Sequence, residues 1–326
     1  MSPNLLEVSG LEKRFPVGGR PLWGTGPMLH AVDGVNFALG AGETLGIVGE
    51  SGCGKTTLGR LVLRLSEPSA GRITFDGQDI THLPQSSMRG LRARLQVVFQ
   101  DPMSSLDPRM TVAEIVAEPL RNMGWSAARR AARVAELLDL TGLAQSAAWR
   151  TPDAFSGGQR QRIAIARAIA PSPQLIVCDE AVSALDVSIQ AQILNLFADL
   201  QARLGLALLF IGHDLAVVRH VSHSIAVMYL GRLVELAPEA TLFERPAHPY
   251  PRALLDSAPV PNPRARRRGA ALTGELPSPI DRPSGCHFST RCPRVQSECR
   301  RVAPEWRVLP GDAAHHVRCH FPLTEA

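Results

Sequence analysis

A glycine-rich run near the N-terminus has the residue types and the spacing that bind phosphate. Residues 49–56 read Gly-Glu-Ser-Gly-Cys-Gly-Lys-Thr, the P-loop pattern, and they follow an apolar stretch at 45–48. Glycines let backbone N–H groups converge on a phosphate at a helix N-terminus. Lys55 would contact the β- and γ-phosphates, and Thr56 would offer Mg²⁺ a hydroxyl. The expected phosphate-site residues are Gly49, Ser51, Gly52, Cys53, Gly54, Lys55, Thr56 and Thr57.

A second apolar run ends in two carboxylates. Residues 175–180 read Leu-Ile-Val-Cys-Asp-Glu, which alone could be a buried strand that meets a solvated turn. Downstream of a phosphate loop, the run predicts a strand that brings Asp179 to Mg²⁺ and Glu180 to an attacking water. The two other isolated reactive side chains are interpreted as packing residues: Cys53 as a small residue that fits its loop and Cys178 as a core residue.

Four cysteines gather near the C-terminus, namely Cys286, Cys292, Cys299 and Cys319. Five, six and nineteen residues separate successive members, unlike the paired Cys-x-x-Cys of a zinc ribbon. In a reducing compartment such a cluster favours metal binding over disulfides. Four thiolates suit a soft metal, and the spacing alone allows zinc nearly as readily as an iron–sulfur cluster.

Length and composition indicate a folded protein with one large domain and a smaller appendage. The chain has 326 residues, of which 45% are hydrophobic and 20% charged. A net charge of +5, partly from arginines at 264–268, does not require a nucleic-acid partner. Residues 1–10 lack the features of a signal peptide, and the apolar stretch 204–212 is too short to span a bilayer. We therefore expect membrane attachment through partners only.

Strands and helices alternate along the chain. A helix is expected at 127–140, with Ser126 as its N-cap. Short apolar runs predict strands at 44–48, 72–75, 95–99, 175–178, 207–211 and 224–228. This alternation is typical of an α/β fold with a mainly parallel sheet.

Between the phosphate loop and the carboxylates lies a more specific motif. Residues 155–162 read Phe-Ser-Gly-Gly-Gln-Arg-Gln-Arg, which resembles the signature motif of ABC ATPases with Phe in the common Leu position. Gln100 resembles the Q-loop glutamine, residues 183–186 resemble the D-loop, and His213 resembles the switch histidine. Together with the phosphate loop and the carboxylate strand, these motifs occur in the family's order, and with the importer-like segments given below the resemblance covers nearly the whole chain.

The resemblance implies a fold and a set of boundaries. Residues 1–257 would form a P-loop ABC ATPase domain, with a mainly parallel sheet, an antiparallel β subdomain and a helical subdomain at about 101–165. A Pro/Arg-rich linker would follow at 258–283, and a small cysteine-rich module at 284–326.

The resemblance also implies roles within a head-to-tail ATPase dimer. Catalysis would fall to Lys55, Gln100, Glu180 and His213, and Mg²⁺ would be held by Thr56, Gln100 and Asp179. Phe15 best matches the position that stacks on adenine, with Trp23 as the weaker alternative. The nucleotide-contacting residues carried over from the signature and D-loop are Ser156, Gly157, Gly158, Gln159 and Asp186. The signature would serve the nucleotide of the partner subunit.

Several further segments resemble the oligopeptide and dipeptide importers. These are residues 98–102, 105–109 and 248–250, although Pro251 stands where that branch usually has Thr. The run at 49–60 is closer to the second, F-type ATPase subunit. Gly-Cys-x-Phe-x-x-Arg-Cys-Pro at 285–293 implies a [4Fe–4S] cluster, with zinc as the alternative.

The expected function is ATP hydrolysis that energises import of oligopeptides, dipeptides or similar small solutes. The implied partners are a second ATPase subunit, identical or different, two permease subunits and an extracytoplasmic solute-binding protein. The expected location is the cytoplasmic face of the inner or plasma membrane. Two alternatives remain: a soluble ABC ATPase that acts on nucleic acid or ribosomes, and a nucleotide-dependent scaffold without turnover.

Overall fold

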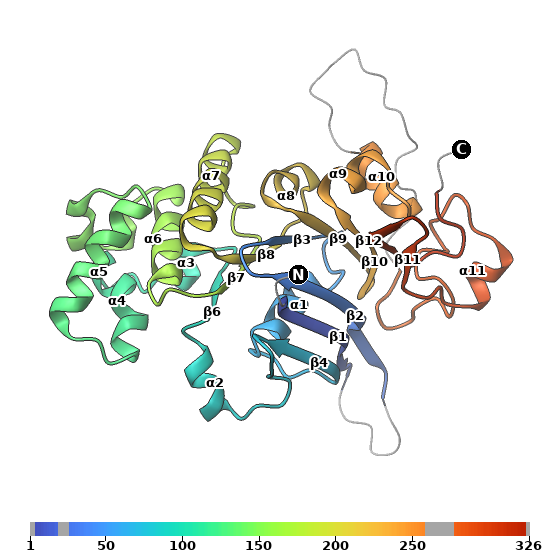
Figure 1. The fold of residues 1–326 in the computed structure, drawn as a ribbon, viewed down its shortest axis with the longest axis horizontal. Helices are drawn as coiled ribbons and strands as arrows, with labels where there is room; N and C mark the ends of the chain where they lie inside the picture. The colour runs from blue at the N-terminus through green and yellow to red at the C-terminus, as the bar shows by residue number, and fades with distance from the viewer. Residues whose placement is uncertain (1–3, 19–25, 258–276, 324–326) are drawn as a thin grey trace, which may run out of the picture.

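The computed structural model describes residues 4–18, 26–257 and 277–323. Two sheets and the helices around them form an elongated molecule (Figure 1). Trp23, the arginines at 264–268 and most of the expected linker lie outside the described residues.

The larger sheet has eight strands in the order β11-β12-β10-β9-β3-β8-β7-β6. Its parallel part confirms the predicted α/β fold class. The parallel strands are β3 (Thr44–Val48), β6 (Leu95–Val98), β7 (Leu175–Asp179), β8 (Ala207–Ile211) and β9 (Ser224–Tyr229). All five match strands expected from the sequence to within one residue at each end.

The second sheet is antiparallel, in the order β2-β1-β4-β5. Its strands are β1 (Asn4–Pro16), β2 (Met28–Gly40), β4 (Ala70–Phe75) and β5 (Gln78–Asp79). This sheet confirms the antiparallel β part of the expected fold. The sequence analysis did not predict β2, in which His30, Asp33 and Asn36 interrupt the apolar residues.

Helices cover the larger sheet and extend beyond one end of it. The helical end contains α3 (Pro102–Ser105), α4 (Val112–Asn122), α5 (Ala127–Leu140) and α6 (Gly157–Ile169), with the 3₁₀ turns Gln145–Trp149 and Pro152–Ala154. The remaining helices are α1 (Lys55–Val62), α2 (Gln85–Leu91), α7 (Val187–Leu204), α8 (Leu215–Val221), α9 (Glu239–Glu244), α10 (Pro249–Ser257) and α11 (Ser297–Arg301). Figure 1 places α4 and α5 at the opposite end of the molecule from α11.

Capping residues account for the boundaries of the two outermost helices. The Ser126 hydroxyl accepts the backbone N–H of Arg129, which confirms the predicted helix and its N-cap. At the start of α4, Thr111 and Glu114 form a reciprocal capping box. Both caps satisfy N–H groups that the first helical turn leaves unpaired.

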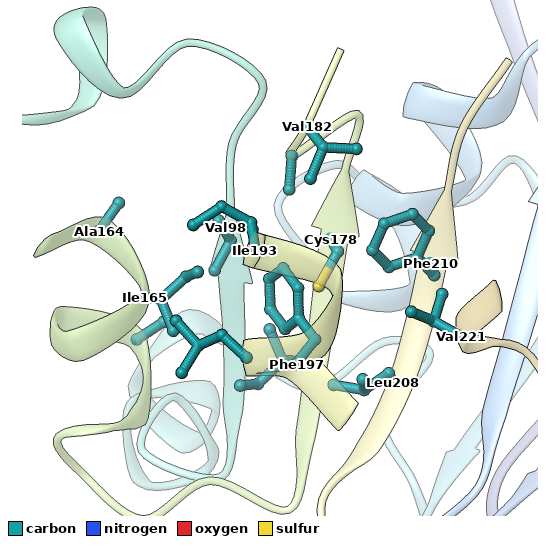
Figure 2. Packing of buried hydrophobic residues seen from close by; sticks show 14 of the residues in the cluster. Val98, Ala164, Ile165, Cys178, Val182, Ile193, Phe197, Leu208, Phe210 and Val221 are labelled. Atoms are coloured by element: carbon teal, nitrogen blue, oxygen red, sulfur yellow. The ribbon is translucent and has the colours of Figure 1, made fainter. Parts of the chain in front are cut away.

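Two clusters of buried apolar residues form the core, one between the larger sheet and the helices on one of its faces, the other among β1, β2, β3, β4 and α1. Phe197 of α7 meets Phe210 of β8 edge to face, with 5.9 Å between ring centroids. Figure 2 shows Cys178 among these rings and the aliphatic side chains of neighbouring elements. Cys178 is fully buried, and burial raises the pKa of its thiol strongly. The interpretation of Cys178 as a core residue is confirmed.

The C-terminal strands extend the larger sheet. Strand β12 (Asp312–Val317) pairs antiparallel with β10 (Arg232–Pro238), and β11 (Arg307–Leu309) pairs with β12. The ring of Phe288 lies 5.3 Å from the rings of both Tyr229 and Tyr250. The last described residues therefore share a sheet and a core with the rest of the chain. The division at 257 and 283 stays a prediction.

A buried carboxylate joins the same segments. Glu235 of β10 is fully buried and accepts the backbone N–H groups of Ala247 and His248 at 2.7 and 2.6 Å. His315 of β12 contacts the same carboxylate at 2.7 Å. Buried charges need such partners, so Glu235 holds the chain before α10 against the C-terminal strand. None of the helices in the described ranges is both long enough and apolar enough to cross a bilayer.

Candidate functional site

The phosphate loop has the predicted strand–loop–helix context. Strand β3 is buried along its whole length and leads into the loop, and α1 begins at Lys55. Gly49 and Gly54 have φ angles of 156° and 110°. A Cβ at Gly54 would lie 2.0 Å from the carbonyl oxygen of Ala31, so only glycine fits there.

Lys55 and Cys53 lie inside this loop. The Lys55 ammonium is buried and donates to the carbonyl oxygens of Gly49 and Glu50 at 2.7 and 3.0 Å. It therefore lies at the inner wall of the loop that would receive phosphate. Burial raises the pKa of the Cys53 thiol, against the opposing effect of Lys55. The thiol is protonated near neutral pH, as expected of a packing residue.

The P-loop threonine meets the first carboxylate. The Thr56 hydroxyl donates to Asp179 Oδ1 at 3.0 Å. Burial raises the pKa of Asp179, and the hydrogen bond from Thr56 opposes that rise. A hydroxyl and a carboxylate at this distance form an oxygen pair of the kind that Mg²⁺ prefers.

The second carboxylate is held by residues from two neighbouring strands. Gln100 Nε2, beyond the end of β6, donates to Glu180 Oε2 at 3.0 Å. His213 Nδ1, beyond the end of β8, lies 3.5 Å from the same oxygen. Glu180 itself has a left-handed φ of 50°, and its N–H donates to Ile211 O at 2.9 Å. Such backbone strain in a bulky residue is typical of functional sites.

Most of these groups line a cavity of ≈ 380 Å³, although Gly49, Asp179 and His213 are not among its lining residues. Its walls include expected residues: Phe15, Ser51, Gly52, Cys53, Gly54, Lys55, Thr56, Thr57, Gln100 and Glu180. They also include Leu29, His30, Ala31, Leu230, Gly231 and Pro279, which the sequence analysis did not identify. No motif marks these six residues, which come from β2, the β9–β10 turn and the segment before the cysteines.

The side chain expected to stack on adenine stands at the mouth of this cavity. Phe15, near the end of β1, is 40% exposed although it is a large apolar residue. The Lys13 ammonium lies 5.0 Å from the centre of its ring. The exposed ring of Phe15 is thus available to stack on a planar base.

The signature residues lie away from this cavity. Ser156, Gly157 and Gln159 are exposed at the start of α6, and Asp186 is exposed at the start of α7. The Gln159 side chain accepts the Ser156 N–H at 3.0 Å, and the Ser156 hydroxyl caps the helix in return. A Cβ at Gly158 would lie 2.5 Å from Ile189, so that glycine allows α6 to approach α7. The chain's own cavity is therefore built without its signature.

The four C-terminal cysteines line one small cavity together with His248, Phe288 and His320. The backbone N–H of Cys286 donates to Cys299 O at 2.7 Å, and a Cβ on Gly285 would lie 2.3 Å from that oxygen. Burial raises the pKa of Cys286 to about 11 and that of Cys319 to about 12. Within the part of the chain that the structure describes, no three histidine, cysteine or carboxylate side chains form a metal-ligand group. The metal site stays a prediction.

A phosphate loop, two carboxylates at the end of a parallel strand, and a glutamine and a histidine on either side define this class of protein as a P-loop ATPase. Residues 32–183 match the family model "ABC transporter". Residues 234–299 match "Oligopeptide/dipeptide transporter, C-terminal region". The chain belongs to the ATP-binding subunits of the ABC transporters, in the oligopeptide/dipeptide branch.

Relatives and solved structures agree with this placement. The chain is 48% identical to the oligopeptide transport ATP-binding protein AppF of Bacillus subtilis, over 97% of each chain. It is 50% identical to a protein of Sinorhizobium fredii named as a probable peptide ABC transporter ATP-binding protein, y4tS, over 98% of this chain and 90% of the relative.

Two solved structures share the fold of the ATPase part. Part of the ABC transporter complex cbiONQ, cbiO1 of Clostridium perfringens, has a TM-score of 0.65 and 28% identity, over 74% of this chain and 90% of that one. The ATP-binding cassette MJ0796, a dimer bound to ADP and Pi, has a TM-score of 0.63 and 27% identity, over 72% and 98%. The predicted family and the predicted ABC ATPase fold are confirmed.

Proposed function

We propose that this chain hydrolyses ATP to energise the import of oligopeptides, dipeptides or similar small solutes. The proposal rests on Lys55, Thr56 and Glu180, which line one nucleotide-sized cavity, and on Asp179, which accepts the Thr56 hydroxyl. The peptide branch is supported by the family match of residues 234–299 and by relatives named for peptide transport. Nothing in these matches favours a ribosomal or nucleic-acid role.

In the proposed mechanism these side chains bind the phosphates, hold Mg²⁺ or act on the attacking water, and Gln100 serves two of these tasks. Lys55 binds the β- and γ-phosphates, and Glu180 takes a proton from the attacking water. Gln100 and His213 orient the Glu180 carboxylate, which both contact in the structure. Thr56, Asp179 and Gln100 would hold Mg²⁺, and their oxygen donors fit that ion. When bound, Mg²⁺ neutralises charge on the phosphates.

The partner at the ATP site is a second ATPase subunit in head-to-tail contact. The signature residues at 156–159 support this arrangement, because Ser156, Gly157 and Gln159 are exposed and none of the four lines the chain's own cavity. Ser156, Gly157 and Gly158 lie at a helix N-terminus, which favours a phosphate supplied from outside the chain. Each nucleotide would then lie between two subunits.

A groove in the helical end is the proposed docking site for a permease. It lies between α4 and α5, has a volume of ≈ 700 Å³, and is lined by Ala117, Ala131, Val134 and Leu138 among others. Trp149 at its edge is 82% exposed. An apolar groove with charged edges suits a short amphipathic helix. Docking here would keep the chain at the cytoplasmic face of the membrane, in a complex that also receives solute from an extracytoplasmic binding protein.

Substituting one groove alanine tests this docking site. Ala131 is exposed and lines the groove, whereas its neighbour Ala132 is exposed but does not. Ala131→Arg is expected to reduce co-purification of the permeases from membranes at least about tenfold, because a charge enters an apolar contact. Ala132→Arg should have no effect, and neither change should alter ATP binding. Equal recovery of permeases with both variants would contradict the proposal.

Purification of the full complex tests the proposed function as a whole. Affinity capture of this chain from detergent-solubilised membranes is expected to recover two permeases and a second ATPase subunit, which mass spectrometry would identify. Peptide uptake by the same complex in proteoliposomes should require ATP. Recovery with ribosomes or nucleic acid, and without permeases, would overturn the proposal.

A [4Fe–4S] cluster on the four cysteines is a further part of this proposal, with zinc as the alternative. The gathering of four thiols in one cavity supports it. Since the pKa values of Cys286 and Cys319 are raised, binding must displace protons and should strengthen as the pH rises.

Metal loading tests the cysteine site. Anaerobic reconstitution with iron and sulfide is expected to give about four iron atoms per chain and broad visible absorbance. Cys292→Ser should lose both, whereas Cys178→Ser, a change at a core thiol outside the cluster, should keep them in the folded fraction. Loading with zinc but not with iron and sulfide would favour the alternative, and loading with neither would exclude the site.

A further inference from the structure

The second residue of the P-loop is held by the C-terminal part of the chain. Arg291 Nη1 donates to both carboxylate oxygens of Glu50, at 2.9 and 3.0 Å. The Arg291 side chain is 6% exposed and that of Glu50 is 26% exposed. Removing one partner of a pair so shielded from water leaves a poorly solvated charge, unlike the loss of an exposed ion pair.

Tyr250 of α10 holds the backbone of Glu50. The Glu50 N–H donates to Tyr250 Oη at 3.1 Å. Tyr250 is fully buried and packs against Tyr229 and Phe288, whose rings lie 4.7 and 5.3 Å away. The Arg291 guanidinium lies 6.0 Å from the centre of the Tyr229 ring. The same aromatic cluster thus contacts both Tyr250 and Arg291, the two side chains that bind Glu50.

Glu50 in turn contacts the lysine expected to bind phosphate. Its carbonyl oxygen accepts the Lys55 ammonium at 3.0 Å. The side chain, N–H and carbonyl of this one residue are therefore tied to Arg291, Tyr250 and Lys55. A shift of Glu50 moves an acceptor of Lys55, and a misplacement of about 1 Å is enough to weaken a phosphate contact substantially.

The position of Arg291 depends on the fold of the cysteine segment. Arg291 lies directly before Cys292, and its N–H donates to Phe288 O at 3.0 Å within the turn that starts at Cys286. The Cys286 to Cys299 backbone hydrogen bond closes the same segment. Disrupting this turn would withdraw the guanidinium from Glu50.

We propose that Arg291 is a positioning residue of the nucleotide site, through which ATP binding at the P-loop depends on the fold of the cysteine segment. The inference rests on the proposed ATP site and adds to it a specific link between two ends of the sequence. A purely structural arginine would change the stability of the C-terminal segment and leave ATP affinity in the folded protein unchanged.

Equilibrium ATP binding to the full chain, without hydrolysis, tests the link. Arg291→Met, of similar length but uncharged, is expected to raise the Kd for ATP about tenfold, the size of effect that follows loss of a charged hydrogen bond. Arg291→Lys should recover part of the affinity, because a single nitrogen makes both contacts. The kcat of the assembled complex should change less than about twofold, so the loss should appear in KM.

A double-mutant cycle separates coupling from general damage. Glu50→Gln should raise the Kd for ATP about as much as Arg291→Met. The Kd of the double variant should be no higher than that of the single variant that binds ATP less tightly. Cys286→Ser should raise the Kd in the wild-type chain and add nothing in the Glu50→Gln chain. Thermal unfolding and circular dichroism identify the variants that fold. If Arg291→Met does not fold, the Kd values of Glu50→Gln, Cys286→Ser and their double variant test the link instead.

The outcomes distinguish this inference from the proposed function. If the wild-type chain binds ATP and folded Arg291→Met or Glu50→Gln binds it equally well, the link is overturned and the ATP site stands. Additive losses in the double variant would also overturn it. If the wild-type chain fails to bind ATP, the proposed function itself fails.

Discussion

Glu180→Gln is expected to bind ATP as the wild-type chain does and to hydrolyse it at its own site at least about a hundredfold more slowly. General-base catalysis contributes about this much or more, and an amide cannot accept the proton. The replacement keeps the size of the side chain, so the contacts of Gln100 and His213 hold the amide where the carboxylate lay. The loss should therefore be in chemistry and not in binding.

Phosphate release by the assembled complex measures this effect, with ATP binding to the isolated chain measured in parallel. Glu136→Gln is the control, because Glu136 is exposed on α5 and lines neither the nucleotide cavity nor the groove. A second ATPase subunit can supply at most one of two sites. Hydrolysis at the full wild-type rate by the Glu180→Gln complex would contradict the role assigned to Glu180.

The parts of the site that sequence could predict are those carried by short contiguous motifs. The P-loop motif predicts a strand, a loop and a helix, because its glycines and the apolar strand before them are adjacent in sequence. The order of the parallel strands was not predicted, yet it explains why Gln100, Glu180 and His213 meet. Strands β6, β7 and β8 are neighbours in the sheet and end at one edge.

The parts that sequence could not predict depend on pairing between distant segments. Asp33 of β2 accepts Arg232 Nε at 2.6 Å and also pairs with Arg282, which joins segments about 200 and 250 residues away. The pairing lowers the pKa of Asp33 although burial alone would raise it. An isolated Asp or Arg in a sequence carries no sign of such a partner. The same applies to Pro279 in the nucleotide cavity and to the pairing of β12 with β10.

The cysteine segment also contains a contact that the sequence could not predict. Its spacing indicated metal chemistry, but gave no hint that Arg291 within it would reach the P-loop. Near this contact Phe288 packs against Tyr229 at the end of β9, and β9 is the neighbour of β3 in the larger sheet. Tertiary pairing, and not local pattern, decides which residues support the nucleotide site.

Substitutions in the P-loop and in the signature are expected to separate ATP binding from ATP hydrolysis. Lys55→Ala should raise the Kd of the isolated chain for ATP at least about tenfold, since a charged contact to phosphate is lost. Gly157→Asp should leave that Kd unchanged, because Gly157 is exposed and lies outside the chain's own cavity. A Cβ at this position would make only an ordinary contact with Leu185, at 3.5 Å, so the variant should fold.

In the assembled complex Gly157→Asp should instead reduce hydrolysis at the partner's site at least about a hundredfold. A carboxylate would replace a helix N-terminal surface that favours phosphate, and like charges repel strongly in a water-poor site. Ala154→Asp, an exposed change just before the signature, is the control and should be neutral.

Binding is measured at a protein concentration at which the chain is monomeric. If Gly157→Asp weakened ATP binding there as much as Lys55→Ala, the signature would serve the chain's own nucleotide, and the head-to-tail dimer would be wrong. If only hydrolysis in the complex falls, each ATP is completed by two subunits, because the groups that bind it and the groups that close over it lie on separate faces of this chain.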